Sequence, residues 1–343
     1  MAEDKVPITM KDIARALDVS VATVSRALSD SPRISKQRRE AIKAYAMEHN
    51  FAPNLLAESL RHSKIRPTKI IGVIIPEFTH YYFSSILSGI NEVASEQGYT
   101  LMVAQSDEKY ETEVDICQKF FHNKVCGVIV SQAKDTKKYN HFERLTNAGV
   151  PLVFYDRICT GIDASRVVVD DYNGAYNAVE HLIKTGCRRI ALFCSPLHLE
   201  ISKNRLNGYR DALLKNGLRV DESLIKHCDN RGDAEVLTRQ ILESEEIIPD
   251  GFFAVNDETA IGIMNTAKRM GYRIPRDMSI CGFTNDGAST ACDPMLTTVE
   301  QRGKEVGRQA ADILISKVEG LTPKDKVVKR IVKTRLVLRE STR

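Results

Sequence analysis

The 343-residue sequence contains no tryptophan, and it has no glycine before Gly72, although 19 glycines occur from there onward. No apolar run reaches the 18 or so residues that span a bilayer. The first 20 residues also lack the uninterrupted apolar stretch of a secretory signal. These absences argue against a membrane-spanning or exported protein and predict a location in the cytoplasm.

Motifs for metals and nucleotide cofactors are missing as well. None of the eight cysteines stands in a C-x2-C or C-x4-C pair, so the spacing of zinc ligands is absent. The sequence has neither G-x-G-x-x-G nor G-x4-G-K-[ST], the loops that hold dinucleotides and nucleoside triphosphates. We therefore expect reduced, mostly buried thiols, no cofactor and no metal.

The excess positive charge lies at one end of the chain. Residues 1–66 carry 12 Lys and Arg against 8 Asp and Glu, whereas charges of the two signs balance in the remainder. The same segment lacks glycine and is rich in Ala, Leu, Ile, Arg and Glu, which predicts short helices and a boundary near 63–67. A small basic domain in front of a neutral body favours contact with a polyanion. The alternative is a solvated basic surface.

Capping residues divide this segment into three helices. Thr9 and Asp12 have the form of a capping box at the start of the first helix, and Ser20 and Ser35 stand at the N-caps of the next two. Asp18 tolerates the left-handed conformation that a tight turn needs. The pattern predicts a helix-turn-helix unit, and the alternative is a helical bundle for protein contacts.

The second of these helices, over residues 21–28, has side chains suited to the major groove of DNA. Arg26 can donate to O6 and N7 of a guanine, and Val21 and Ala22 can contact thymine methyl groups. The sequence therefore predicts base recognition by this helix.

The stretch IARALDVSVATVSRALSDSPRISKQRREAI resembles the helix-turn-helix of the LacI/GalR (lactose-repressor) family, with Asp18 where the family usually has Gly. Residues 51–54 stand where the family has Tyr-x-Pro-Asn. Residues 55–61 stand where it has a hinge helix, whose leucine, here Leu60, wedges into the minor groove and kinks the duplex. The resemblance implies this set of DNA-binding residues: Thr9, Ser20, Val21, Ala22, Thr23, Ser25, Arg26, Asn54, Ala57, Leu60 and Arg61.

From residue 69 onward, strand-length apolar runs alternate with amphipathic helical patterns. The expected strands include 70–75, 101–104, 127–130, 152–155, 190–193 and 251–255. The expected helices include 83–98, 172–186, 201–217, 232–244 and 257–271. This alternation predicts parallel sheets in an α/β fold, and the number of units implies two sheets.

The resemblance extends over essentially the whole chain and implies an all-α helix-turn-helix domain followed by a periplasmic-binding-protein-like core of two doubly wound parallel-sheet lobes. In such a core the ligand binds between the lobes, at the carboxyl ends of the strands. The implied division is 1–53 for the DNA-binding domain, 54–67 for the hinge helix and linker, and 68–343 for the ligand-binding and dimerisation core. The N-lobe is expected over about 68–168 and 300–327, and the C-lobe over about 169–299 and 328–343. A last strand over 331–338 is expected to close the core, and with no heptad tail after it we expect a homodimer.

Candidate effector-binding residues follow the predicted strands. Aromatic side chains after the first strand can stack on sugar rings or flat bases, and Asp156 beside Arg157 can bind vicinal hydroxyls. The resemblance adds Arg205 and Asn256, which match effector-binding positions of the family. The predicted set is Tyr81, Tyr82, Phe83, Asp156, Arg157, Arg205, Asn256 and Thr284. The alternatives are a structural ion pair for Asp156 and Arg157, lobe packing for the tyrosines and helix capping for Asp257.

One departure from the family bears on the ligand. Thr284 and Asn285 stand where the family usually has two acids. Neutral side chains repel an anionic ligand less than carboxylates do, so an acidic or phosphorylated sugar is one hypothesis for the effector.

The resulting expectation is a transcription regulator, most simply a repressor of a carbohydrate-utilisation operon, which binds a pseudo-palindromic operator and a sugar or sugar-derived effector. The alternatives are a solute-binding receptor without DNA function and a purine-type regulator that requires a co-repressor. An enzyme is not expected, because Asp170 and Asp171 would point to opposite faces of a strand and make a poor catalytic dyad. The effector, the operator, the choice between induction and co-repression or between repressor and activator, and any higher oligomer stay open.

Overall fold

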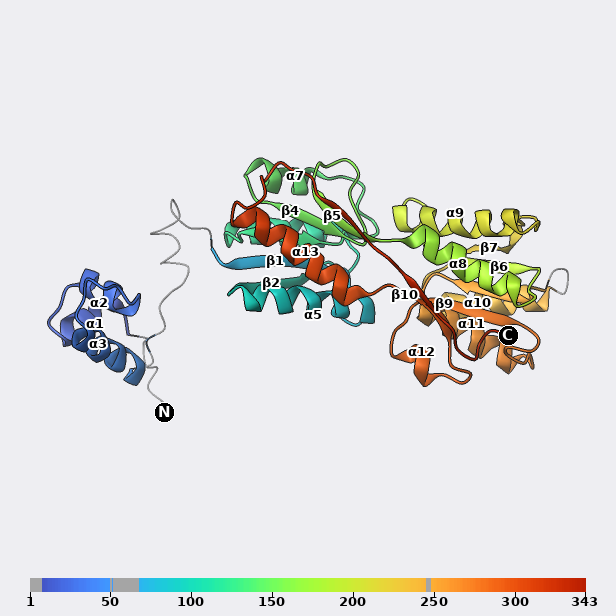
Figure 1. Ribbon diagram of the computed structural model, residues 1–343, viewed down its shortest axis with the longest axis horizontal. Helices are drawn as coiled ribbons and strands as arrows, with labels where there is room; N and C mark the ends of the chain where they lie inside the picture. Colours follow the sequence, from blue (N-terminus) through green and yellow to red (C-terminus); the bar gives the residue numbers. More distant parts are fainter. Residues whose placement is uncertain (1–7, 50, 52–67, 245–247) are drawn as a thin grey trace. The chain divides into compact units, whose positions relative to one another are not determined.

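The computed structural model describes residues 8–49, 51, 68–244 and 248–343. The chain divides into two compact units, residues 1–68 and residues 69–343 (Figure 1). No helix among the described residues is long and apolar enough to cross a membrane.

The first unit consists of the helices α1 (Met10–Ala16), α2 (Val21–Leu28) and α3 (Lys36–Glu48). Their inward faces share a small apolar core that includes Ile13, Val24 and Ile42. Asp18 adopts a φ of 48° in the turn between α1 and α2, the left-handed conformation expected there. The three helices therefore form the predicted helix-turn-helix unit.

Local hydrogen bonds fix the starts of two of these helices. Thr9 and Asp12 form the predicted capping box, in which the Thr9 N–H donates to Asp12 Oδ2 at 2.9 Å. Ser20 Oγ accepts from the Thr23 N–H at 3.1 Å and caps α2. Ser35 occupies the N-cap of α3, but its side chain makes no capping hydrogen bond.

The second unit contains two six-stranded sheets, one in each lobe. The N-lobe sheet has the order β11-β5-β4-β3-β1-β2, and all of its neighbouring pairs are parallel. Its strands are β1 (Ile70–Ile75), β2 (Thr100–Gln105), β3 (Gly127–Val130), β4 (Leu152–Tyr155), β5 (Ser165–Val169) and β11 (Lys329–Val332).

The C-lobe sheet has the order β12-β10-β9-β8-β6-β7. Its strands are β6 (Ile190–Cys194), β7 (Ile225–His227), β8 (Gly251–Ala254), β9 (Ser279–Thr284), β10 (Thr297–Glu300) and β12 (Arg335–Val337). The edge strand β12 pairs antiparallel with β10, so this lobe departs from the purely parallel sheet that the sequence predicts.

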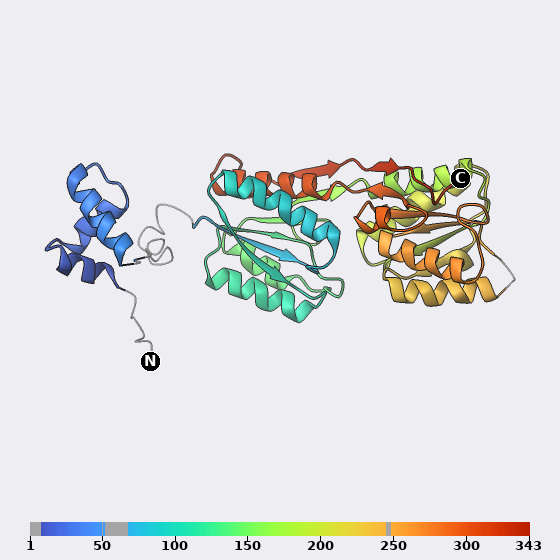
Figure 2. The same cartoon turned by 90° about the horizontal axis from the view of Figure 1, so that it is seen from below.

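Helices cover both faces of each sheet (Figure 2). In the N-lobe, α5 (Tyr81–Glu96) and α13 (Gly303–Val318) pack on one face, and α6 (Tyr110–His122) and α7 (Asn140–Asn147) pack on the other. In the C-lobe, α8 (Asp171–Lys184) and α9 (Glu200–Lys215) face α10 (Arg231–Glu243) and α11 (Asp257–Arg269) across the sheet. The short α12 (Ala288–Ala291) and the 3-10 turn η1 (Glu222–Leu224) complete the lobe.

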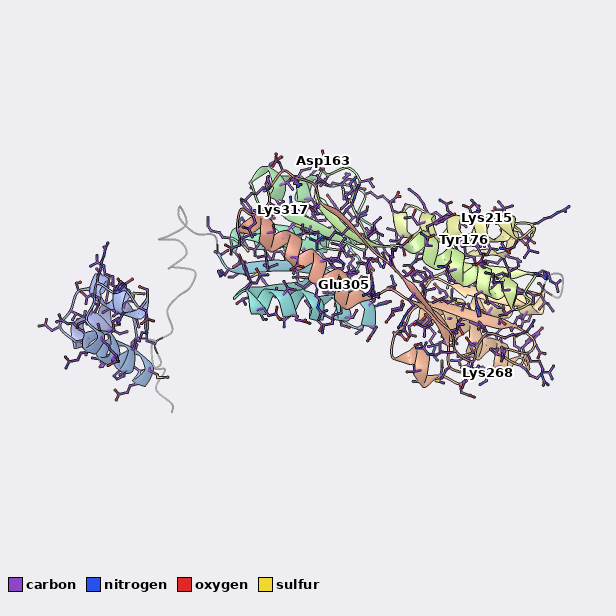
Figure 3. The ribbon with its side chains drawn as sticks, viewed as in Figure 1. Asp163, Tyr176, Lys215, Lys268, Glu305 and Lys317 are labelled. Carbon is purple, nitrogen blue, oxygen red and sulfur yellow. The ribbon has the colours of Figure 1, made fainter. Side chains whose placement is uncertain are left out.

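Long side chains extend the packing on the surface of the C-lobe. Lys215, from α9, lies over the ring of Tyr176, from α8, with its Nζ 4.9 Å from the ring centroid (Figure 3). The apolar stem of such a lysine covers part of the helix contact while its charge stays in water.

Three crossovers connect the lobes, and the position of the third in the sequence differs from the predicted one. The chain passes between lobes after β5, after β10 and between β11 and β12. The predicted single strand over 331–338 is wrong, because β11 and β12 belong to different sheets and are separated by Lys333 and Thr334. The predicted C-lobe boundary at 328 is therefore also wrong, since β11 completes the N-lobe.

All eight cysteines are free, and all except the half-buried Cys292 are buried. Burial raises the pKa of the Cys194 and Cys228 thiols to about 11, which keeps them protonated. The prediction of reduced, mostly buried thiols is confirmed.

Candidate DNA-binding surface and effector cavity

The exposed face of α2 carries the predicted recognition side chains. Ala22 and Arg26 are exposed, and Val21, Thr23 and Ser25 are partly buried, whereas Val24 and Ala27 face the core. Arg26 has no salt-bridge partner among the described residues, and α2 contains no acidic residue. Its guanidinium is therefore available for an external acceptor.

Among the other predicted DNA-binding residues, Thr9 and Ser20 have structural roles, and four more are not described by the structure. The Thr9 hydroxyl belongs to the capping box, and Ser20 Oγ both caps α2 and lies 2.8 Å from Thr23 Oγ1. The predicted hinge contacts lie outside the described residues; these are Asn54, Ala57, Leu60 and Arg61.

In the second unit, a cavity of about 570 Å³ opens between the two lobes. The carboxyl ends of the parallel strands of both sheets line it: segments after β1, β2, β3 and β4 in the N-lobe, and in the C-lobe segments after β6, β7 and β8 and the last residue of β9. This edge is where open α/β sheets bind ligands. The crossover after β10 adds Gln301 to the wall.

The cavity contains all but one of the predicted effector-binding residues. Those that line it are Tyr82, Phe83, Asp156, Arg157, Arg205, Asn256 and Thr284. Tyr81 does not line the cavity and is 51% exposed, so its predicted placement is wrong. The reason is the start of α5 at Tyr81, because successive helical side chains point about 100° apart and only Tyr82 and Phe83 turn inward.

Arg157 is held by a carboxylate that the sequence analysis missed. Its Nη1 lies 2.6 and 2.7 Å from the two oxygens of Glu108, whereas its neighbour Asp156 is 4.0 Å from Nε. Glu108 reaches this position from a loop in which Asp107 and Glu108 both adopt positive φ values, 53° and 59°. The guanidinium also lies over the ring of Phe83, 5.5 Å from its centroid. Arg157 is thus oriented from two sides.

A salt bridge joins the two lobes across the cavity. Lys134, after β3, places its Nζ 2.8 Å from Oδ2 of Asp229, after β7. Although burial alone would raise the pKa of Asp229, the Lys134 ammonium holds it below the usual value. Asp229 is therefore ionised at neutral pH, and the bridge is a true ion pair.

Arg205 on α9 forms the most enclosed ion pair of the cavity. Its Nε and Nη2 lie 2.8 and 2.7 Å from Asp171 Oδ1, and its Nη1 donates to the Val255 carbonyl at 2.7 Å. Burial raises the pKa of Asp171 to about 6, although Arg205 opposes the shift. The predicted effector arginine is therefore fixed before any ligand arrives.

The Asn256-Asp257 pair has a clear structural role. Asn256 caps α11, with Oδ1 accepting from the Thr259 N–H at 2.8 Å and Nδ2 donating to the Asp229 carbonyl at 2.8 Å. Asp257 is buried and accepts from the Thr298 hydroxyl and from the Asp286 N–H. Of the two, only Asn256 lines the cavity.

Thr284, the last residue of β9, lines the cavity, whereas the neighbouring Asn285 does not. Thr284 is buried, and its hydroxyl donates to Gln301 Oε1 at 3.0 Å, which leaves the Gln301 amide nitrogen for other partners. Asn285 Oδ1 accepts from Arg339 Nη2 at 2.6 Å. The neutral pair is thus built into hydrogen bonds with residues of the crossover and the C-terminal segment.

Two further titratable groups of the wall are shifted by burial. Burial lowers the pKa of His80, and the nearby Arg157 cation lowers it further, so the imidazole that caps α5 is neutral at pH 7. Burial also raises the pKa of Asp156 above its usual value, against the attraction of Arg157 and Arg205.

The cavity is also lined by residues outside the predicted set. Most of them lie shortly after a strand, whereas Ile201 and Glu258 lie in the first turns of α9 and α11. The full set is Glu77, Thr79, His80, Glu108, Lys134, Ser195, Ile201, Asp229, Asn230, Arg231, Val255, Glu258 and Gln301. The rule that strand ends line the cleft would have found those that follow clear strands, such as Lys134. Those after β7 were hidden, because this three-residue strand has no apolar run of its own.

Comparisons with known proteins agree with both units. Residues 9–54 match the model of bacterial regulatory proteins of the lacI family, and residues 179–342 match that of a periplasmic binding protein-like domain. A ribose operon repressor of Halalkalibacterium halodurans is 33% identical over 336 residues, which cover 98% of this chain and 97% of that protein. The HTH-type transcriptional repressor PurR of Vibrio atlanticus is 30% identical over 313 residues, 91% of this chain and 92% of that one.

A solved structure with a bound ligand is also similar. It is a LacI family transcriptional regulator from Enterococcus faecium with bound ribose, with 27% identity and a TM-score of 0.69 over 80% of this chain and 98% of that chain. A helix-turn-helix unit, a two-lobed receptor with its cavity at the strand ends, and relatives similar over nearly the whole length lead to one conclusion. The chain belongs to the LacI family of bacterial regulatory proteins.

Proposed function

We propose that this protein is a DNA-binding repressor of a sugar-utilisation operon, and that its effector is a neutral monosaccharide bound in the cavity between the lobes. The observation that carries the choice of ligand is the pairing of charges in the cavity wall. The DNA-binding part of the proposal is supported by membership of the LacI family and by Arg26, which lies on the exposed face of α2 without a salt-bridge partner among the described residues.

Each cationic side chain in the wall already has a carboxylate partner. Arg157 is paired with Glu108, Lys134 with Asp229, Arg205 with Asp171 and Arg231 with Glu235. An anionic ligand would have to break one of these pairs to gain a counter-ion, which leaves a poorly hydrated charge without a partner.

Carboxylates, in contrast, remain in the wall without a close cation. Glu77 and Glu258 have no salt bridge among the described residues, and Asp156 is 4.0 Å from Arg157 Nε. Hydroxyl groups donate to such acceptors through charge-assisted hydrogen bonds. The ribose-bound structural neighbour and the ribose operon repressor among the relatives support a pentose as the first ligand to test. The acidic or phosphorylated sugar considered from Thr284 and Asn285 is disfavoured.

Ligand control of DNA binding follows from a cavity that is lined by residues of both lobes. A ligand that contacts both lobes binds one relative arrangement of the lobes more tightly than the others and shifts the population toward it. In a homodimer on a two-fold operator, such a shift changes how the two reading helices match their half-sites. With DNA as its partner the protein acts in the cytoplasm, and we propose no catalytic activity for it.

A purine is the second candidate ligand, because one relative is named PurR and aromatic side chains line the cavity. The roles of the ligand would then be reversed, with co-repression in place of induction. The cavity offers Phe83 for stacking, but the face of Phe83 is partly covered by Arg157, which favours the sugar.

The test is calorimetric titration of the purified protein with D-ribose, ribose 5-phosphate and hypoxanthine, followed by operator binding with and without each ligand. We expect heat of binding for D-ribose or another neutral sugar, with weaker or no binding of the phosphate. Tight binding of ribose 5-phosphate would contradict the charge argument. Tight binding of hypoxanthine that strengthens operator binding would establish the purine alternative.

A further inference from the structure

Glu113, on α6, is a fully buried carboxylate that does not line the cavity. Three donors satisfy it: the Ala133 N–H at 2.7 Å, the Thr136 hydroxyl at 2.7 Å and His141 Nε2 at 2.9 Å. A carboxylate is buried at large cost unless such bonds replace its hydration. The hydrogen bonds of Glu113 therefore fix the groups that donate them, and these groups show what Glu113 holds in place.

Two of these donors flank Lys134, the N-lobe partner in the interlobe salt bridge. Ala133 precedes Lys134 and Thr136 follows it by two residues, so Glu113 fixes the backbone on both sides. The Lys134 N–H between them donates to Glu108 at 2.9 Å, and its ammonium reaches Asp229 at 2.8 Å. The path from Glu113 to the opposite lobe therefore runs through one short loop.

The same loop touches the C-lobe with its backbone. His198, just before α9, lies with Nε2 2.6 Å from the Lys134 carbonyl oxygen. The segment 131–136 consequently meets the other lobe through a side chain and through a main-chain atom. A loop that contacts the other lobe at two points stabilises the arrangement of the lobes, provided that its own backbone is held in place.

We propose that Glu113 is a positioning residue for the effector cavity: by holding Ala133 and Thr136 it presents Lys134 to Asp229 and stabilises the arrangement of the lobes that this salt bridge joins. Glu113 acts through Lys134 and touches no ligand. The expected effect of Glu113 on effector affinity rests on the proposed function. Its expected effect on the salt bridge between Lys134 and Asp229 does not.

The first experiment measures the coupling between Lys134 and Asp229 in the ligand-free protein. The urea midpoints of Lys134→Met, Asp229→Asn and the double variant are compared with the parent, first in the wild-type background and then with Glu113→Gln. In the wild-type background we expect the sum of the two single-variant shifts in urea midpoint to exceed the shift of the double variant, because each single variant already removes the same salt bridge. With Glu113→Gln the shifts should become additive, because Lys134 no longer reaches Asp229.

The matched control is Glu111→Gln, a substitution of an exposed glutamate two residues away on the same helix. This variant should leave the non-additivity intact. If non-additivity also persists with Glu113→Gln, then Glu113 merely stabilises the N-lobe and the proposal is wrong. Should Glu113→Gln fail to fold, Thr136→Val removes one donor at nearly constant volume and is tested in the same cycle, with the same two outcomes.

The second experiment uses D-ribose as the probe in calorimetric titration. Glu113→Gln should weaken ribose binding about three- to tenfold, and in the Lys134→Met background it should weaken binding no further. Equal weakening in both backgrounds would contradict the route through Lys134. If the wild-type protein itself does not bind ribose, the proposed ligand fails, while the urea cycle still decides the role of Glu113.

Discussion

Arg205 lies on the ring of Phe283, with its guanidinium carbon 3.9 Å from the ring centroid, and both side chains are buried. The stack and the ion pair with Asp171 together leave the planar guanidinium one orientation, with its edge in the cavity wall. Because the side chain is ordered in advance, a ligand that binds it loses little further entropy.

Arg205→Lys should therefore remove much of the effector response although it keeps the charge. An ammonium has neither the fork that matches Asp171 and the Val255 carbonyl nor the flat face that covers Phe283. We expect effector affinity to fall by about tenfold or more, with operator binding of the free protein unchanged. Calorimetry and operator titrations measure the two quantities. Arg210→Lys, on the same helix at a more exposed ion pair, is the control, and an equal effect of both variants would remove Arg205 from the site.

Arg26→Ala should lower specific operator binding by roughly 1–3 kcal/mol, the range of one good base contact. Binding to a random duplex should change much less, because that binding depends on the total of phosphate contacts. Competition titrations at fixed salt with operator and scrambled duplexes measure both. Equal losses on the two duplexes would show that Arg26 contacts the backbone only.

Asp257 makes stability depend on pH in a defined direction. Burial raises the pKa of Asp257 to about 7, even though the Thr298 hydroxyl and the Asp286 N–H stabilise its charge. The unfolded chain releases this proton near pH 4, so between about pH 4 and 7 the folded state binds one proton more than the unfolded state. Raising the pH through this window should lower the free energy of unfolding.

Asp257→Asn removes that titration, so its thermal midpoint should fall less between pH 5 and 7 than that of the wild type, whatever the change at any one pH. Midpoints measured in a pH series test the slope. The control is Asp312→Asn on the exposed face of α13. A wild-type slope that persists in Asp257→Asn would assign the pH dependence to another group.

Gly307→Ala should destabilise the N-lobe by about 1–3 kcal/mol or more, the usual range for overpacking. A Cβ at Gly307 would lie 2.0 Å from the Ile86 carbonyl oxygen, because α13 and α5 cross at nearly backbone contact. Since the obstacle is backbone, no side-chain rotation relieves it. Gly287→Ala, with nothing within 4 Å of the new Cβ, should be nearly neutral. Thermal unfolding measures both, and similar midpoints would refute the close crossing.

The sequence predicts local features well where one residue determines them. The capping box of Thr9 and Asp12 and the turn at Asp18 depend only on neighbours in the chain, and both occur in the structure. The strand Ile70–Ile75 likewise has the bounds that its apolar run predicts.

Predictions failed where partners distant in sequence decide the outcome. Glu108 belongs to the cavity only because two residues with positive φ turn it toward Arg157, 49 positions away. The run over 331–338 reads as one strand, because alternation along a chain carries no information about which sheet each half joins. The prediction for Tyr81 failed because the direction of a helical side chain changes by about 100° from one residue to the next, and the direction of Tyr81 depends on where α5 begins.

The division of the C-terminal segment between β11 and β12 makes the two lobes interdependent. A fragment that ends before Lys329 would expose the edge of β5 and would also leave β10 without its outer neighbour. Neither lobe is a continuous piece of the chain, so neither can be excised or completed on its own during synthesis. Both sheets are complete only when residues 329–337 are present, so loss of this segment would disrupt the two lobes together.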